Sequence, residues 1–368
     1  MNYLIPFIIL ITVVVFIHEY GHYYFAKKFG VGITDFSIGF GKEIFGWKDS
    51  FGTRWKICWI PLGGYVKFFG DRNVYSQTEQ DNVVKSYDSK DREKLFILKP
   101  LYQRSIIVAA GPLANFILAI LIFFFINVFS GKDLTPAIIN EVQKDSPAFV
   151  SGLKKNDVII SIDNNKVESI LEISTFINAS TADIIEFVIL RDNRQLSKFV
   201  KPIFVNGKDS LGNSVKKRIV GIKLSPLNNK YNKKTLGPSK AMYYSVKEVW
   251  FVTITSLNFI GKMLTGSGDT SQLGGPIKIA KITGQVAEYG IIPFLSIMAY
   301  ISISLGLVNL FPIPMLDGGH LMFYFFEKVF GEPLSQKTQE IFFRIGLFLL
   351  LSLMLFVTFN DLKDLNLF

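Results

Sequence analysis

Cysteine is almost absent from this sequence, which has one, Cys58, in 368 residues. A single cysteine excludes an intrachain disulfide framework, and its apolar neighbours indicate a packing role. Histidine is scarce as well, with three residues. Dense basic blocks are also missing, because the lysines and arginines behind the formal net charge of +10 are spread along the polar segments. We therefore interpret the charge as a membrane-surface bias and expect no nucleic-acid partner.

Long apolar runs are what the sequence has instead. Hydrophobic residues make up 49% of the chain, and Phe alone accounts for 35 positions. Crossing about 30 Å of hydrocarbon takes about 20 apolar residues. Four runs have this length, at residues 3–26, 106–129, 290–311 and 341–359. No Lys or Arg precedes the first run and no small-residue cleavage site follows it, which argues against a cleaved signal peptide. We expect an α-helical polytopic membrane protein with about four transmembrane helices.

The basic residues beside these runs predict the topology. Lys27, Lys28, Lys99 and Arg104 flank the first loop, whereas residues 1–17 contain no Lys or Arg. Cytoplasmic flanks carry the excess of positive charge. We therefore expect residues 27–103 and 312–340 to lie inside, and the N-terminus, residues 130–289 and the C-terminus to lie outside.

Composition divides the chain into four expected segments. The first and last are membrane cores, and residues 71–99 of the first are polar enough for an exposed loop. The second alternates β-branched runs such as "DVIISI" and "IIEFVIL" with turns, which is typical of a β-rich outer domain. The third contains a helix, residues 239–264, expected on the membrane surface, with a short fifth span as the alternative. The segments are residues 1–130, 131–228, 229–288 and 289–368.

The motif "HEYGH" carries the chemistry of the first run. On a helix, His18 and His22 share a face about 6 Å apart along the axis, so both imidazoles can bind one metal ion, with Glu19 beside them as a general base. His18 lies about 22 Å into the run, where ionisable groups are costly and therefore usually functional. This pattern predicts a zinc site for peptide hydrolysis.

A third ligand is expected from "NLFPIPMLDGGH", residues 309–320, because the first and third runs both end at the inner face. Pro312 and Pro314 end the helix, and the glycines let the chain turn. Either Asp317 or His320 can then reach the metal. Zinc's borderline softness favours the imidazole, whereas the position directly after the proline break favours Asp317.

Two further segments are expected near this site. The apolar, β-prone and glycine-broken "ICWIPLGGYVKFF", residues 57–69, is typical of a membrane-dipping hairpin. Its Gly63, Gly64 and Tyr65 are candidate substrate contacts, because strand addition to an exposed edge can unwind a substrate helix. In the second run, "GPLAN", residues 111–115, predicts close packing against the helix of the motif, with a simple kink and a satisfied Asn115 amide as the alternative. Glu327 and Arg344 are expected to be solvent-exposed residues at the ends of their segments.

These motifs resemble the site-2 protease family of intramembrane zinc metalloproteases, in particular the bacterial regulator of sigma-E protease group. The resemblance rests on "HEYGH" and "NLFPIPMLDGG" and extends to "FSIGFG", "WIPLGGYVKFFG", "AAGPLANFILA" and "LGGPIKIA". "SPAFVSGLKKNDVIISIDNNKV", residues 146–167, resembles the start of a PDZ domain. The resemblance thus implies a PDZ domain inserted between the membrane cores. Residues 131–228 hold room for one such domain rather than the tandem pair of the best-known members, so gating by a paired-PDZ filter is in doubt.

The resemblance implies that His18, His22 and Asp317 bind one Zn²⁺, that Glu19 is the catalytic carboxylate, and that Asn309 lies near the substrate backbone. It also implies cleavage of single-span membrane proteins within the bilayer after another protease has shortened them, in regulated intramembrane proteolysis. Anti-sigma factors and remnant signal peptides are the implied substrates, and a bacterial inner membrane is the implied location. The PDZ domain would then contact substrate ectodomains or C-termini on the outer side.

Two other functions are compatible with the sequence. A metal-dependent transporter would need several intramembrane polar residues along a path, and few lie outside the metal cluster. An inactive PDZ scaffold would not require the intact Glu19 or the full ligand set.

Overall fold

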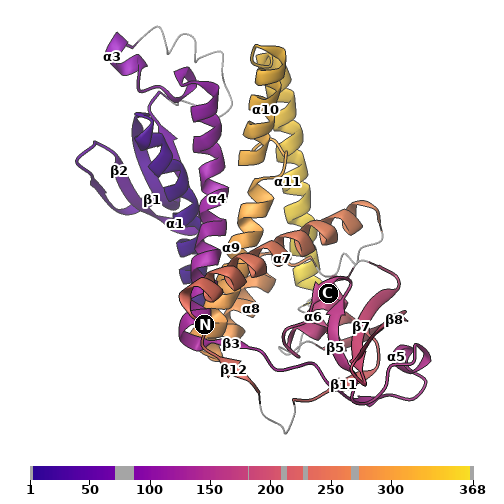
Figure 1. Ribbon diagram of the computed structural model, residues 1–368. Helices are drawn as coiled ribbons and strands as arrows, with labels where there is room; N and C mark the ends of the chain where they lie inside the picture. Colours follow the sequence, from indigo (N-terminus) through magenta and orange to yellow (C-terminus); the bar gives the residue numbers. More distant parts are fainter. Residues whose placement is uncertain are drawn as a thin grey trace. The chain divides into compact units, whose positions relative to one another are not determined.

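The computed structural model describes residues 3–70, 87–180, 182–208, 214–226, 231–266 and 273–364. It contains two compact units (Figure 1), one of Met1–Ile122 with Leu273–Phe368 and one of Phe123–Gln272. The first unit carries the expected membrane cores, and the second carries the expected β-rich domain. Most of the expected loop at residues 71–99 lies outside the described residues.

The four expected membrane spans are confirmed as helices. Among the described residues, 4 helices are long and apolar enough to cross a bilayer. The first is α1, Leu4–Lys28, and the second, Leu101–Ser130, joins α4, Leu101–Phe125, to a π-helical turn η2, Ile126–Ser130. The third is α9, Ile291–Asn309, and the fourth lies within α11, Gln336–Asp364. Helix α7, Pro238–Leu264, is not among them, so the alternative of a fifth span receives no support.

Glycines bring the helices of the first unit close together. A Cβ atom on Gly21 of α1 would lie 2.3 Å from the Ala110 carbonyl oxygen of α4. A Cβ on Gly306 of α9 would lie 2.9 Å from the Pro112 carbonyl oxygen of α4. Small residues allow such backbone contact between membrane helices. The expected close packing of the second span against the first is therefore confirmed, and α1 and α4 run side by side in Figure 1.

Two shorter helices complete the C-terminal half of this unit. Helix α8, Pro276–Glu288, packs against α1, and α10, Asp317–Phe330, follows α9. Asp361 of α11 caps α8, because its carboxylate accepts hydrogen bonds from the Gly275 and Ile277 amides at 2.8 and 3.0 Å. The start of α8 is thereby fixed to the end of the last span.

A long antiparallel hairpin follows α1. Its strands are β1, Ile33–Lys48, and β2, Arg54–Phe68. Residues 35–38 of β1 pair on one side with residues 64–67 of β2 and on the other with residues 54–57. The first of these β2 segments is therefore an outer edge of the sheet within the described residues. Two short helices, α3 at Ser89–Arg92 and η1 at Phe96–Leu98, precede α4.

The second unit is β-rich around its own core. Its main sheet has the strand order β6-β5-β7-β8. Alternating buried residues of β7, such as Ile185, Phe187 and Ile189, form the centre of the core together with Ile173 of α6. The identification of this unit as a PDZ domain stays a prediction. Its elements are β3 Lys132–Asp133, β4 Ile139–Val142, α5 Pro147–Val150, β5 Val158–Ile162, β6 Asn165–Lys166, α6 Glu172–Ala179, β7 Ile185–Arg191, β8 Arg194–Val200, β9 Ile203–Lys208, β10 Ser214–Ile219, β11 Ile222–Leu224 and β12 Lys233–Lys234.

Helix α7 belongs to this second unit. The Phe251 ring contacts the Phe176 ring of α6 at a centroid distance of 5.1 Å. Ser245 accepts a hydrogen bond from Asn127 of η2 at 3.1 Å, and the Lys247 ammonium lies 3.5 Å from Glu168. The expected helix at residues 239–264 is therefore present, and it packs on the β-rich core. Its position on a membrane surface stays a prediction.

Candidate metal centre

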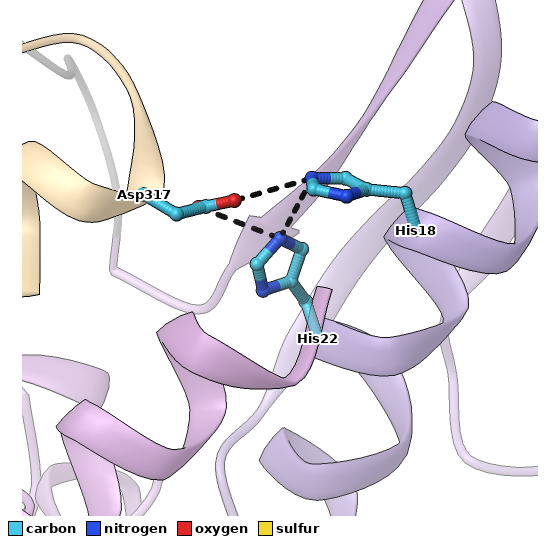
Figure 2. Close-up of side chains that lie close together, drawn as sticks. All are labelled: His18, His22 and Asp317. Atoms are coloured by element: carbon cyan, nitrogen blue, oxygen red, sulfur yellow. Dashed lines mark hydrogen bonds and ion pairs between the residues drawn. The ribbon is translucent and has the colours of Figure 1, made fainter. Parts of the chain in front are cut away.

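Three side chains converge where α1 meets the start of α10. His18 and His22 project from consecutive turns of α1, and their Nε2 atoms lie 3.3 Å apart. Asp317, the first residue of α10, points its carboxylate between them (Figure 2). Its Oδ2 lies 3.2 Å from His18 Nε2, and its Oδ1 lies 3.5 Å from His22 Nε2. The segments that carry the two sequence motifs, HEYGH and NLFPIPMLDGGH, thus meet at one point.

These separations fit a tetrahedral zinc ion. Zinc binds imidazole nitrogens and carboxylate oxygens at about 2.0 to 2.2 Å, so two ligand atoms of a tetrahedron lie about 3.3 to 3.5 Å apart. The three ligand–ligand distances here run from 3.2 to 3.5 Å. Within the described residues these three are the group of His, Cys, Asp and Glu side chains that could hold a metal ion. Three protein ligands leave the fourth position for water or substrate, as catalytic zinc sites require.

The histidines are oriented by α4. His22 Nδ1 donates a hydrogen bond to the Ile107 carbonyl oxygen at 2.9 Å, which leaves the Nε2 lone pair for a metal. The Asn115 amide lies 3.2 Å from His18 Nδ1, and its buried Oδ1 has no hydrogen-bond partner. The two ends of an amide have the same shape. The orientation in which Asn115 Oδ1 accepts the Nδ1 proton supplies that partner and frees His18 Nε2 for metal.

Asp317 reaches the centre because the chain folds tightly before α10. A Cβ on Gly318 would lie 2.2 Å from the Phe311 carbonyl oxygen, and one on Gly319 would lie 2.4 Å from the Ile313 carbonyl oxygen. Only glycine allows such approaches. Burial alone would raise the pKa of the Asp317 carboxyl, but the adjacent histidines hold it below its usual value. The side chain is therefore ionised near pH 7, the form in which a carboxylate can bind a metal ion.

The alternative third ligand, His320, lies outside the three-residue group. It occupies the first turn of α10, where its ring contacts Phe343 at a centroid distance of 5.7 Å. Burial lowers the pKa of its imidazole, so the side chain is neutral near pH 7. The geometry thus favours Asp317 over His320, and the assignment of the ligand stays a prediction.

A cavity of about 940 Å³ is lined by His18, His22 and Asp317. Glu19 lines it beside them, and Asn309 at the end of α9 places its Nδ2 3.4 Å from His18 Nε2. The edge of β2 forms another wall through Gly63, Gly64, Tyr65 and Val66. A Cβ on Gly64 would lie 3.0 Å from Glu19 Cγ, so a glycine lets this edge pack against the carboxylate. All the predicted site residues therefore line one cavity.

Several contacts near this centre have no local signal in the sequence. The Ile107 contact is made by a backbone carbonyl, which every residue type has. Gly111 was expected only to pack against α1, yet a Cβ there would lie 2.2 Å from His22 Nε2. The expectation that Glu327 is solvent-exposed was wrong. Its carboxylate is paired with Arg104 at 2.5 Å, and its side chain is 18% exposed. Arg344 fits the expectation, with its side chain 83% exposed.

A membrane-spanning helix that places two histidines and a glutamate beside an aspartate from a distant helix is typical of a membrane-bound metallohydrolase. The chain matches Peptidase family M50 over residues 6–353. It belongs to this family of site-2-type proteases and is a zinc-dependent metalloprotease.

Relatives with similar names cover nearly the whole chain. Two are named "Putative zinc metalloprotease". One, from Agrobacterium fabrum, is 38% identical over 364 residues, which are 99% of this chain and 96% of that protein. The other, from Mesorhizobium japonicum, is 39% identical over 363 residues, or 98% of each chain. "Metalloprotease MmpA" of Caulobacter vibrioides is 35% identical over 387 aligned residues, covering 99% of this chain and 96% of that protein.

Proposed function

We propose that this protein cleaves single-span membrane proteins within the bilayer, with His18, His22 and Asp317 as zinc ligands. The observation that carries the proposal is the position of the ligands. His18 is the fifteenth residue of a 25-residue apolar helix, about 21 Å from its start. A peptide bond attacked there lies at a depth that soluble segments of a substrate do not reach.

Glu19 is the general base in this proposal. When bound, zinc polarises the peptide carbonyl and acidifies the attacking water. Glu19 lines the cavity next to the two histidines, where its carboxylate can take the water proton and later deliver it to the leaving amine. Asn309, 3.4 Å from His18 Nε2, is placed to donate a hydrogen bond from its amide to the substrate backbone.

The substrate must be extended to reach these groups, because a helix hides its amides in hydrogen bonds. The outer edge of β2 offers backbone partners to such a segment, and Gly63, Gly64 and Tyr65 of this edge line the cavity. In the proposal the substrate adds as a strand beside β2, with its scissile carbonyl toward the metal ligands. The glycines keep this wall free of bulky side chains.

The cellular setting follows the predicted topology together with the resemblance to the regulator of sigma-E protease group. The protein lies in the bacterial inner membrane, with the β-rich second unit on the outer side. In this proposal that unit is a PDZ domain that contacts substrate ectodomains or C-termini. The substrates, such as anti-sigma factors or remnant signal peptides, have already lost most of their outer part. The role is the second cut in regulated intramembrane proteolysis, as in the regulator of sigma-E protease group.

The test is co-expression of the full chain with tagged single-span substrates, comparing wild type with Glu19→Gln. Glutamine preserves the shape of the side chain but cannot accept the proton, so we expect the variant to retain zinc and to lose cleavage. Turnover by Glu19→Gln would contradict the general-base role. Zinc-loaded wild type that cuts none of the substrates would favour a transporter or a scaffold.

A further inference from the structure

The metal centre depends on the relative position of two helices that are distant in sequence. Helix α1 supplies His18 and His22, and α10 supplies Asp317. The two histidines are oriented by α4, through the Ile107 carbonyl and the Asn115 amide. The Asp317 carboxylate therefore lies within 3.5 Å of the histidine nitrogens only if α10 keeps its position relative to α4.

A partly buried ion pair links α4 directly to α10. Arg104 Nη2 and Nη1 donate to Glu327 Oε1 and Oε2 at 2.5 and 3.2 Å, which is a bidentate arrangement. The two side chains are 16% and 18% exposed. Arg104 Nε also donates to the Lys99 carbonyl oxygen at 3.1 Å, and the guanidinium lies 5.0 Å from the Tyr324 ring centroid. The arginine is thus fixed on α4 and in contact with two residues of α10.

The ion pair and the ligands line the same cavity. Glu327 follows Asp317 by ten residues, about 15 Å along α10. A bound metal ion would hold the first residue of α10, and Arg104 holds its third turn through Glu327. A helix attached at one point can pivot about it, whereas attachment at two points fixes its direction.

We propose that Arg104 and Glu327 are positioning residues that hold Asp317 in place for metal binding. This inference rests on the assignment of Asp317 as a ligand under the proposed function. Pre-organised ligands bind more tightly, because binding does not have to order them. Loss of the pair leaves all three ligands present and lets α10 pivot, so the folded protein binds zinc more weakly.

The experiment measures zinc affinity of the purified full chain by competition with a chromophoric chelator. The variants are Arg104→Met, Glu327→Gln, the double variant and Arg104→Lys. Arg344→Met is the matched control, because Arg344 lies in α11 with its side chain 83% exposed. Thermal unfolding of the metal-free variants separates a loss of fold from a loss of positioning. Visible absorption of the cobalt-substituted proteins reports the ligand geometry.

We expect Arg104→Met and Glu327→Gln each to lower zinc affinity about tenfold, the lower end of the losses measured when the support of a metal ligand is removed. The double variant is expected to lose no more than either single one, because the two residues act through each other. Arg104→Lys keeps the positive charge but cannot make the bidentate contact, so its zinc affinity is expected to lie between those of wild type and Arg104→Met. The zinc affinity of Arg344→Met is expected to be unchanged. If Arg104→Met does not fold, Glu327→Gln carries the test.

Wild-type zinc affinity in the folded single variants, or losses that add in the double variant, would overturn the inference. Asp317→Asn is measured alongside them. If that variant keeps wild-type affinity, the ligand assignment itself fails. If it loses zinc while the Arg104 and Glu327 variants do not, the positioning role alone fails.

Discussion

Replacing Gly111 by alanine should weaken zinc binding without destabilising α4, the helix that contains Gly111. A Cβ at this position would lie 2.2 Å from His22 Nε2, whereas ordinary contacts begin at 3.4 Å. The imidazole or α4 must therefore move by about 1.2 Å, while zinc–ligand distances hold to about 0.2 Å. Alanine in a helix interior is favoured over glycine by about 0.5 to 1 kcal/mol, so helix propensity does not oppose the change. We expect zinc affinity to fall by about 100-fold, the upper end of the range for changes around a metal site.

The assay for Gly111→Ala is chelator competition on the purified protein, with Gly261→Ala as the control. Gly261 lies in α7, and a Cβ there would meet nothing within 4 Å. The control should retain wild-type zinc affinity and cleavage. A folded Gly111→Ala protein that binds zinc like wild type would refute the contact on which this reasoning depends.

Two other changes separate substrate handling from metal binding. Asn309→Ala should keep zinc, because Asn309 is not a ligand, but should lower the cleavage rate about 100-fold or more if its amide stabilises the developing oxyanion; unchanged turnover would contradict that role. Deletion of residues 131–228 should leave some cleavage of already-shortened substrates, because the three metal ligands belong to the other compact unit. Complete loss of activity in a folded, zinc-loaded deletion would contradict this expectation.

The part of the site that could be predicted from the sequence is the part that depends on helical periodicity. The spacing of His18 and His22 fixes both on one face of α1, and the apolar runs locate the four spans to within a few residues. Spacing and ligand chemistry narrowed the third ligand to Asp317 or His320, and the family resemblance selected Asp317. Which of them faces the metal depends on where α10 begins, and that is set by tight backbone contacts between the glycines and residues 311–313.

Contacts made by backbone atoms, or made possible by the missing side chain of a glycine, could not be predicted from the sequence. The Ile107 carbonyl orients His22, and the missing side chain of Gly111 makes room for its ring. The hairpin was expected, but the pairing of residues 35–38 of β1 with two separate segments of β2 was not. It depends on a break in register around Gly39 and Gly41, both with φ of +88°. The Arg104–Glu327 pair joins residues 223 positions apart, which no local pattern can predict.

The central claim is that His18, His22 and Asp317 form the zinc site, and metal analysis of two purified variants tests it most directly. Asp317→Asn removes a charged ligand whose oxygens lie 3.2 and 3.5 Å from the histidine nitrogens, so we expect zinc occupancy to fall sharply and cleavage to be lost. His320→Ala should keep zinc and at least part of the activity, because His320 contacts Phe343 and lies outside the ligand group. Zinc loss in His320→Ala with full occupancy in Asp317→Asn would contradict the account.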